Sequence, residues 1–187
     1  MASTLKINNL DTASGTTITI PAGKQIIGTD QMSIKAPGMV IQVQSGQLIT
    51  QFTKSSSLGT YSDVGLSVTI TPKYSNSKIH VHATGNTYAA ASGDNPLHKI
   101  VRTVSGTATT IAATDYMCYS GHGDGTGGAY VQSIMDTAQS TTAHEYKIQL
   151  RSDSSGGTVY FNVNDSNNSG TANEAQLSTI TVMEIAQ

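Results

Sequence analysis

The chain has 187 residues, of which 37% are apolar and only 12% are charged, and its formal net charge is −2. This length fits one domain with an appendage, or two small units. The ten Lys and Arg residues are scattered, so no basic surface for nucleic acid is expected, and no apolar stretch reaches the length of a membrane span. Lys6 and Asp11 interrupt any signal-peptide core, so we expect synthesis in a cytosol.

The composition indicates a thin core. Trp is absent and Phe occurs only at Phe52 and Phe161, so the core must rest on Ile, Val, Leu and eight Tyr residues. Low charge and abundant Thr suit β-sheets whose faces meet other protein. A core of this kind favours stabilisation by oligomerisation.

Residues 1–36 are predicted to form an extended arm. Their apolar side chains are sparse and are separated by turn formers such as Ser14-Gly15 and Pro21-Ala22-Gly23. Strands this short and polar cannot bury enough surface to offset the entropy of the chain, so the arm needs another polypeptide to lie on. The apolar residues expected to make that contact are Leu5, Ile7, Leu10, Ile18, Ile20, Ile26 and Ile27.

Residues 37–187 are predicted to form a separate β-domain. Pro37-Gly38 favours a turn between the two parts. The first strand begins near residue 39 and could continue past Gly46 to Phe52, and residues 54–63 form a polar loop. The next strand covers residues 64–71, with Val64, Leu66, Val68 and Ile70 on one face.

The following strand, residues 78–84, places Ile79, Val81 and Ala83 inward and His80 and His82 outward. We expect no convincing helix; a helical turn would best fit residues 133–143. The pattern of short strands with a turn signal about every 8–12 residues is typical of a β-sandwich or jelly roll. Further strands are predicted at residues 97–104, 107–113, 129–135, 144–151, 158–163 and 175–185.

Several of these segments resemble one protein family. Residues 1–30, 36–43, 65–79, 146–151 and 177–185 resemble small fibre-like and tail-fibre proteins of tailed bacteriophages. The resemblance implies an all-β, jelly-roll-like homotrimer that is part of the virion. The resembling segments do not separate a tail fibre from a head-decorating protein. In the hypothesis that we favour, residues 1–36 dock on another virion protein and the β-domain meets the host surface, where a glycan is a candidate partner.

His80 and His82 are the candidate metal ligands. Two positions along a strand separate their imidazoles by about 7 Å on one face, so three copies around an axis could surround one metal ion. No third ligand accompanies the pair, and partly exposed surface histidines are the alternative interpretation. We therefore expect no metal and no cofactor.

The glycine-rich segment 120–128 is the candidate for receptor contact, and the residues proposed for it are Tyr119, His122, Asp124 and Tyr130. It lacks the Lys of a phosphate-binding loop. Ser120, His122 and Asp124 could be written as a triad, but no strand–elbow–helix context surrounds them. A tolerant surface loop is the alternative. Cys118 is interpreted as a small buried side chain.

The sequence thus favours a non-enzymatic virion protein, a short tail fibre. The alternative is a capsid decoration protein whose arm staples capsomers. Two further hypotheses are a glycan-active enzyme, which would need clustered acids or a triad in one cleft, and a free carbohydrate-binding module, which would leave the arm unexplained.

Overall fold

The structure is a computed structural model that describes residues 20–25, 27, 36–55, 59–90, 94–114, 126–153, 157–163 and 177–187. The chain divides into two units, Met1–Ile34 and Lys35–Gln187. In the first unit, Lys24 N–H donates to the Pro21 carbonyl at 3.1 Å and closes a turn. Ile20 and Ile27 are exposed. The other arm residues, Leu5, Ile7, Leu10, Ile18 and Ile26, lie outside the described residues.

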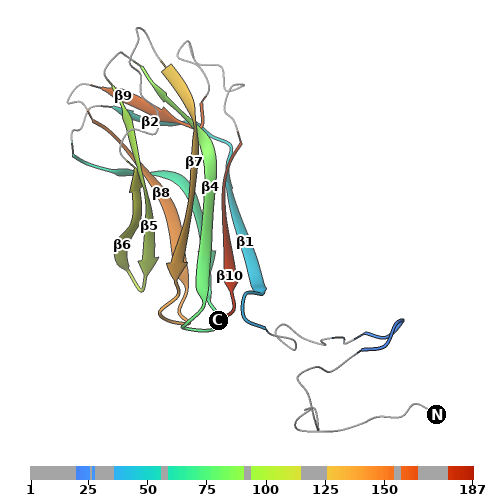
Figure 1. Ribbon diagram of the computed structural model, residues 1–187. Coiled ribbons are helices and arrows are strands. Elements are labelled where there is room, and N and C mark those ends of the chain that lie inside the picture. The colour runs from blue at the N-terminus through green and yellow to red at the C-terminus, as the bar shows by residue number, and fades with distance from the viewer. Residues whose placement is uncertain are drawn as a thin grey trace. The chain divides into compact units, whose positions relative to one another are not determined.

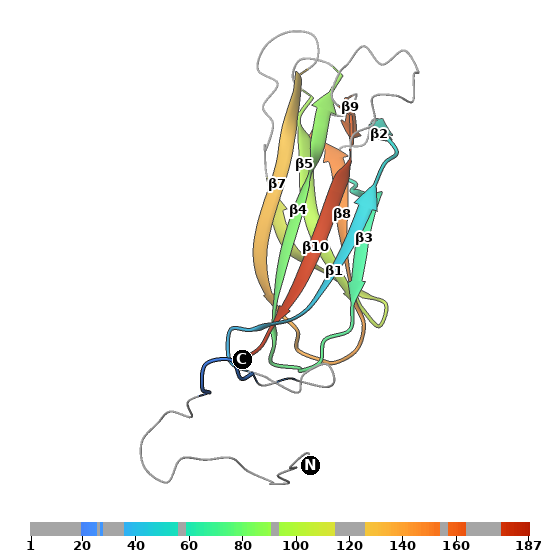
Figure 2. The same cartoon turned by 90° about the vertical axis from the view of Figure 1, so that its right-hand side faces the viewer.

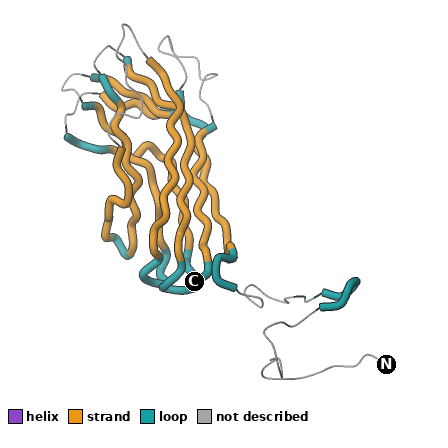
Figure 3. The backbone as a smooth tube through the Cα atoms, viewed as in Figure 1, coloured by secondary structure: helices purple, strands orange, loops and turns teal. Residues whose placement is uncertain are grey.

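The second unit consists of antiparallel strands that pack as two sheets (Figures 1 and 3). The described ranges contain no helix, and so none that is long and apolar enough to cross a membrane. The prediction of an all-β fold with two packed sheets is confirmed. The strands are β1 (Val40–Leu48), β2 (Phe52–Ser55), β3 (Ser62–Ile70), β4 (Lys78–Ala89), β5 (Pro96–Val104), β6 (Thr107–Thr114), β7 (Thr126–Thr137), β8 (His144–Ser152), β9 (Thr158–Phe161) and β10 (Ser178–Ile185).

Sheet A is the six-stranded sheet, in the order β1-β10-β4-β9-β2, with β7 also paired to β4. Sheet B is the four-stranded sheet, in the order β3-β8-β5-β6. β1 and β3 are edge strands of the two sheets, and they contact each other where the sheets meet on one side of the sandwich (Figure 2). β6 and β7 are edge strands as well, and β10 lies inside sheet A between β1 and β4.

The core lies between the sheets and follows the alternation read from the sequence. Val64, Leu66, Val68 and Ile70 of β3 are all buried, as predicted. β4 buries Ile79, Val81 and Ala83 and turns His80 and His82 outward, which is also confirmed. The core residues of the other strands include Ile100, Tyr146, Ile148, Leu150, Phe161, Ile180 and Val182.

For the described residues the expectation of no convincing helix is confirmed, but three predicted details were wrong. The polar loop predicted over residues 54–63 is shorter, because Lys54 and Ser55 pair in β2 and Ser62 and Asp63 pair in β3. Residues 133–143 do not begin as a helical turn, because β7 pairs with β4 without interruption from Thr126 to Thr137. The first strand does not continue from Gly46 to Phe52. It ends at Leu48, because the Asn162 side chain donates to the Leu48 and Thr50 carbonyls at 3.1 Å each, and the chain resumes as β2 against β9.

Candidate functional site: the outer face of sheet A

The outer face of sheet A is built from rows of side chains that cross four strands. Antiparallel register aligns residues of β1, β10, β4 and β7, and residues two apart on a strand share a face. The three central rows are Val43–Met183–His80–Met135, Ser45–Thr181–His82–Ser133 and Gln47–Thr179–Thr84–Val131.

This face is apolar and hydroxyl-rich, and it carries almost no charge. Val43, Val131 and Met135 are each about half exposed, at 49%, 50% and 51%. Of the outward-pointing residues that the structure describes on β1, β10, β4 and β7, Lys78 alone is a Lys, Arg or carboxylate, and its Nζ donates to Thr137 Oγ1 at 2.9 Å. Sheet faces that stay in water normally carry charged side chains of both signs.

Several polar groups on the face are already paired with one another. The hydroxyls of Ser45 and Thr181 lie 3.0 Å apart, and those of Thr84 and Thr179 also lie 3.0 Å apart. His80 Nε2 lies 2.7 Å from Ser133 Oγ. Because these groups already have protein partners, covering the face would leave few of them unsatisfied.

The outer face of sheet B is different. Lys147 forms an ion pair with Asp63 at 2.7 Å. Lys99 Nζ and Arg151 Cζ lie 4.4 Å and 5.2 Å from the centre of the Tyr61 ring. These charged side chains are typical of a face that stays in water, so the two faces of one sandwich differ sharply in charge.

The ion pair with Lys147 also affects the pKa of Asp63 on the outer face of sheet B. Burial raises the pKa of the Asp63 carboxyl, but hydrogen bonds from Lys147 and Gln149 outweigh burial and hold that pKa below its ordinary value.

His80 and His82 lie at the centre of the outer face of sheet A. Their ring centroids are 6.3 Å apart, so both imidazoles project from the same face of β4. No third His, Cys, Asp or Glu joins them within the ranges that the structure describes. A single chain therefore presents two nitrogen ligands at this point.

Tyr130 does not belong to a receptor-contacting surface, which corrects the prediction for this residue. It is fully buried on β7, where its ring stacks on His98 with centroids 4.6 Å apart. Its hydroxyl donates to Gln132 Oε1 at 2.7 Å, and burial raises its pKa. The other residues proposed for receptor contact, Tyr119, His122 and Asp124, lie outside the described residues.

Sequence reasoning identified His80 and His82 but missed the face around them. The small number of charged residues in the chain was one sign of an uncharged face. Only the strand register, however, shows that Val43, Met183 and Met135 share one row with His80.

No protein-family model and no curated protein matches the chain. Among solved structures it is similar to Eiger TNF from S. frugiperda, at 11% identity and a TM-score of 0.38, over 81% of this chain and 95% of that one. It is also similar to the infectious bursal disease virus VP2 subviral particle, at 12% identity and a TM-score of 0.43, over 87% of this chain and 42% of that one.

A third similar structure is a pentameric capsid protein isolated from metagenomic phage sequences, at 13% identity and a TM-score of 0.25, over 64% of each chain. The chain spans less than half the length of the bursal disease virus protein. With TM-scores below 0.5, these likenesses assign no function.

Proposed function

We propose that the chain is a non-enzymatic structural protein of a virus particle, whose copies assemble as a homotrimer through the outer face of sheet A. The single observation that supports this most is the contrast between the two faces of the sandwich. One carries an ion pair and two cations around Tyr61. The other presents rows of Val, Met, Thr and His, and among the described outward-pointing residues of β1, β10, β4 and β7 only Lys78 is charged.

The physical reason is the cost of desolvation. Burying an unpaired charge is expensive, whereas burying apolar surface stabilises an interface by roughly 25 cal/mol for each Å². Covering the outer face of sheet A with a second protein surface therefore costs little desolvation free energy. Three copies related by a closed axis would bury three such faces together and leave no copy with an uncovered face.

Residues 1–36 supply the second part of the proposal. The resemblance of this segment to tail-fibre proteins, with its alternating apolar residues, favours an arm that docks on another virion protein. Strand addition to a neighbouring sheet is the mode we propose, because backbone hydrogen bonds then provide the affinity.

A short tail fibre is the form that we favour. Its β-domain would project to the host surface, and Tyr119, His122 and Asp124 would contact a host glycan. A capsid decoration protein, with the arm stapling capsomers, is the second candidate, and the same family resemblance supports it. Electron micrographs of particles labelled on this protein separate the two, since label at the tail supports the fibre and label over the head supports the decoration protein.

The experiment that tests the assignment is deletion of residues 1–36. We expect the truncated protein to remain a trimer in sedimentation, because the outer face of sheet A is intact, and to be lost from purified particles. Full-length protein, expressed at the same level, is the control. Normal incorporation of the truncated protein would contradict the role of the arm, and a monomeric full-length protein would contradict the trimer.

A further inference from the structure

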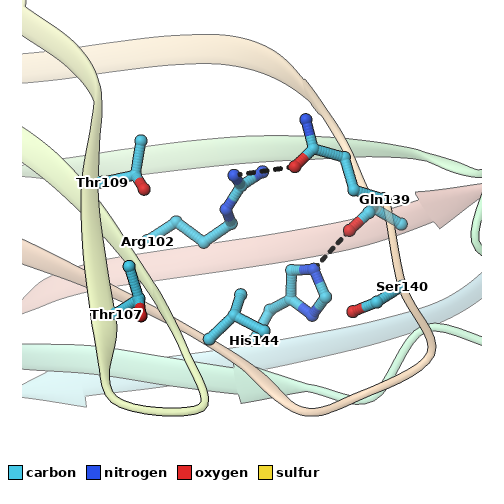
Figure 4. Close-up of a pocket in the computed structure, with 8 residues that line it drawn as sticks. Arg102, Thr107, Thr109, Gln139, Ser140 and His144 are labelled. Atoms are coloured by element: carbon cyan, nitrogen blue, oxygen red, sulfur yellow. Dashed lines mark hydrogen bonds between the residues drawn. The ribbon is translucent and has the colours of Figure 1, made fainter.

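A pocket of about 340 Å³ lies away from the outer face of sheet A, between the β5–β6 hairpin and the β7–β8 connection, residues 138–143 (Figure 4). Its polar lining consists of Arg102, Thr107, Thr109, Gln139, Ser140 and His144. A volume of this size is within the range of small-molecule sites.

Arg102 is fixed at the pocket by one side of its guanidinium group. Its Nη1 donates to Asp136 Oδ1 and Oδ2 at 3.0 and 2.9 Å and to the Thr137 carbonyl at 3.1 Å. Tyr146 Oη also donates to Asp136 Oδ2, at 2.9 Å. The residue is only 8% exposed, so its position is set by buried contacts and not by solvent.

The other edge of the guanidinium group is only partly used. Nη2 donates to Gln139 Oε1 at 3.3 Å, and Nε is buried with no hydrogen-bond partner among the residues that the structure describes. Nε–H and Nη2–H lie side by side on one edge of the planar group, which is the fork that takes a carboxylate in a bidentate pair. A buried donor that makes no hydrogen bond costs free energy. A second acceptor at this edge would therefore be stabilising.

The Gln139 side chain occupies the Nη2 half of that fork, where its Oε1 accepts the hydrogen bond from Nη2. Its backbone has φ of +62°, a left-handed conformation that is uncommon outside glycine and that often accompanies ligand sites. His144 holds the connection on both sides of this residue, with Nε2 at 2.5 Å from the Ala138 carbonyl and Nδ1 at 2.6 Å from the Thr142 carbonyl. The Gln139 residue itself is exposed, so its amide can swing away without disturbing the core.

We propose that this pocket binds a small carboxylate-bearing sugar, with its carboxylate on Nε and Nη2 of Arg102 in place of the Gln139 amide. The hydroxyls of Thr107 and Thr109 line the same pocket and match the hydroxyl groups of a sugar ring, whereas the Ser140 hydroxyl beside them already lies 2.8 Å from Thr142 Oγ1. Both nitrogens of His144 lie against backbone carbonyls, so the His144 ring forms part of the pocket wall. Contacts with the ligand would come from Arg102, Thr107 and Thr109. The inference does not depend on the trimer or on the arm.

The test is a titration of the full-length protein followed by backbone amide NMR, with glucuronate as the probe and glucose as its neutral counterpart. We expect glucuronate to shift the resonances of Gln139 and Ser140 in a saturable way, and glucose to leave them in place. Acetate is the third probe. Acetate that binds as tightly as glucuronate would overturn the assignment to a sugar.

Two substitutions of Gln139 test whether glucuronate binds at the fork of Arg102. Gln139→Ala removes the competing amide, and we expect it to tighten glucuronate binding by roughly tenfold, the effect of about 1.4 kcal/mol. Gln139→Glu places a carboxylate on the fork within the same chain, and we expect it to abolish binding and to raise the melting temperature. Unchanged glucuronate affinity in both variants, or no response of the wild-type protein, would overturn the proposal.

Discussion

Gly46 of β1 lies against the backbone carbonyl oxygen of Ser67 in β3, so closely that a Cβ atom on residue 46 would overlap that oxygen. β1 and β3 are edge strands of sheets A and B, and this contact brings the two sheets together on one side of the sandwich. Ile180 Cγ2 would be 3.3 Å from the same Cβ, so the site is tight on two sides.

We expect Gly46→Ala to destabilise the fold by about 1–3 kcal/mol, because the obstructing atom belongs to the backbone and cannot rotate away. The measurement is the denaturant midpoint in urea. Ser45→Ala, at the neighbouring position that points outward, is the comparison variant, and it should lower the midpoint less than Gly46→Ala does, because it loses only the hydroxyl contact with Thr181. Equal midpoints for Gly46→Ala and the wild-type protein would contradict the contact.

His98 makes the fold sensitive to acid. It is fully buried, stacks on Tyr130 and lies 6.0 Å from the ring of Phe161, and burial lowers its pKa from 6.5 to about 3. Between these two values the unfolded chain binds a proton at His98 that the folded chain does not. Its contribution to stability is therefore complete above pH 6.5 and falls as the pH drops, by about 1.4 kcal/mol for each pH unit.

The free energy of unfolding should thus fall by about 2 kcal/mol between pH 6.5 and pH 5. His98→Phe retains the aromatic stack and removes the titration, so most of this slope should disappear in that variant. Urea unfolding at a series of pH values gives both slopes. A wild-type slope that persists unchanged in His98→Phe would show that another group causes it.

The strands that could be predicted from the sequence are those with a strict two-residue period. Val64 to Ile70 alternate with Gly, Ser and Thr, and the alternation alone gives the buried face of β3. The outward position of His80 and His82 followed in the same way. These are local patterns, and they do not depend on which strand lies beside them.

What the sequence could not show depends on distant partners. The break after Leu48 exists because Asn162, which is 114 positions along the chain, binds its carbonyl. β7 extends to Thr137 because β4 offers a partner along its whole length. The fork of Arg102 becomes visible only when Asp136 and Gln139 are placed around it, since neither residue forms a motif with Arg102 in the sequence.

The proposed subunit interface makes a prediction about charge. Val43 and Met135 stand at the two ends of one row on the outer face of sheet A, and each is about half exposed, so the double variant Val43→Lys and Met135→Lys should fold as the wild-type chain does. Lysines at both ends would bring like charges together between copies and would have to be desolvated on assembly. Thr69→Lys, on the exposed outer face of sheet B, is the matched control.

Sedimentation equilibrium of these three proteins at tens of micromolar is the most direct test of the account. We expect the wild-type protein and Thr69→Lys to have the mass of a trimer, and the Val43→Lys and Met135→Lys double variant to have the mass of a monomer. A monomeric wild-type protein, or a double variant that remains trimeric, would contradict assembly through the outer face of sheet A.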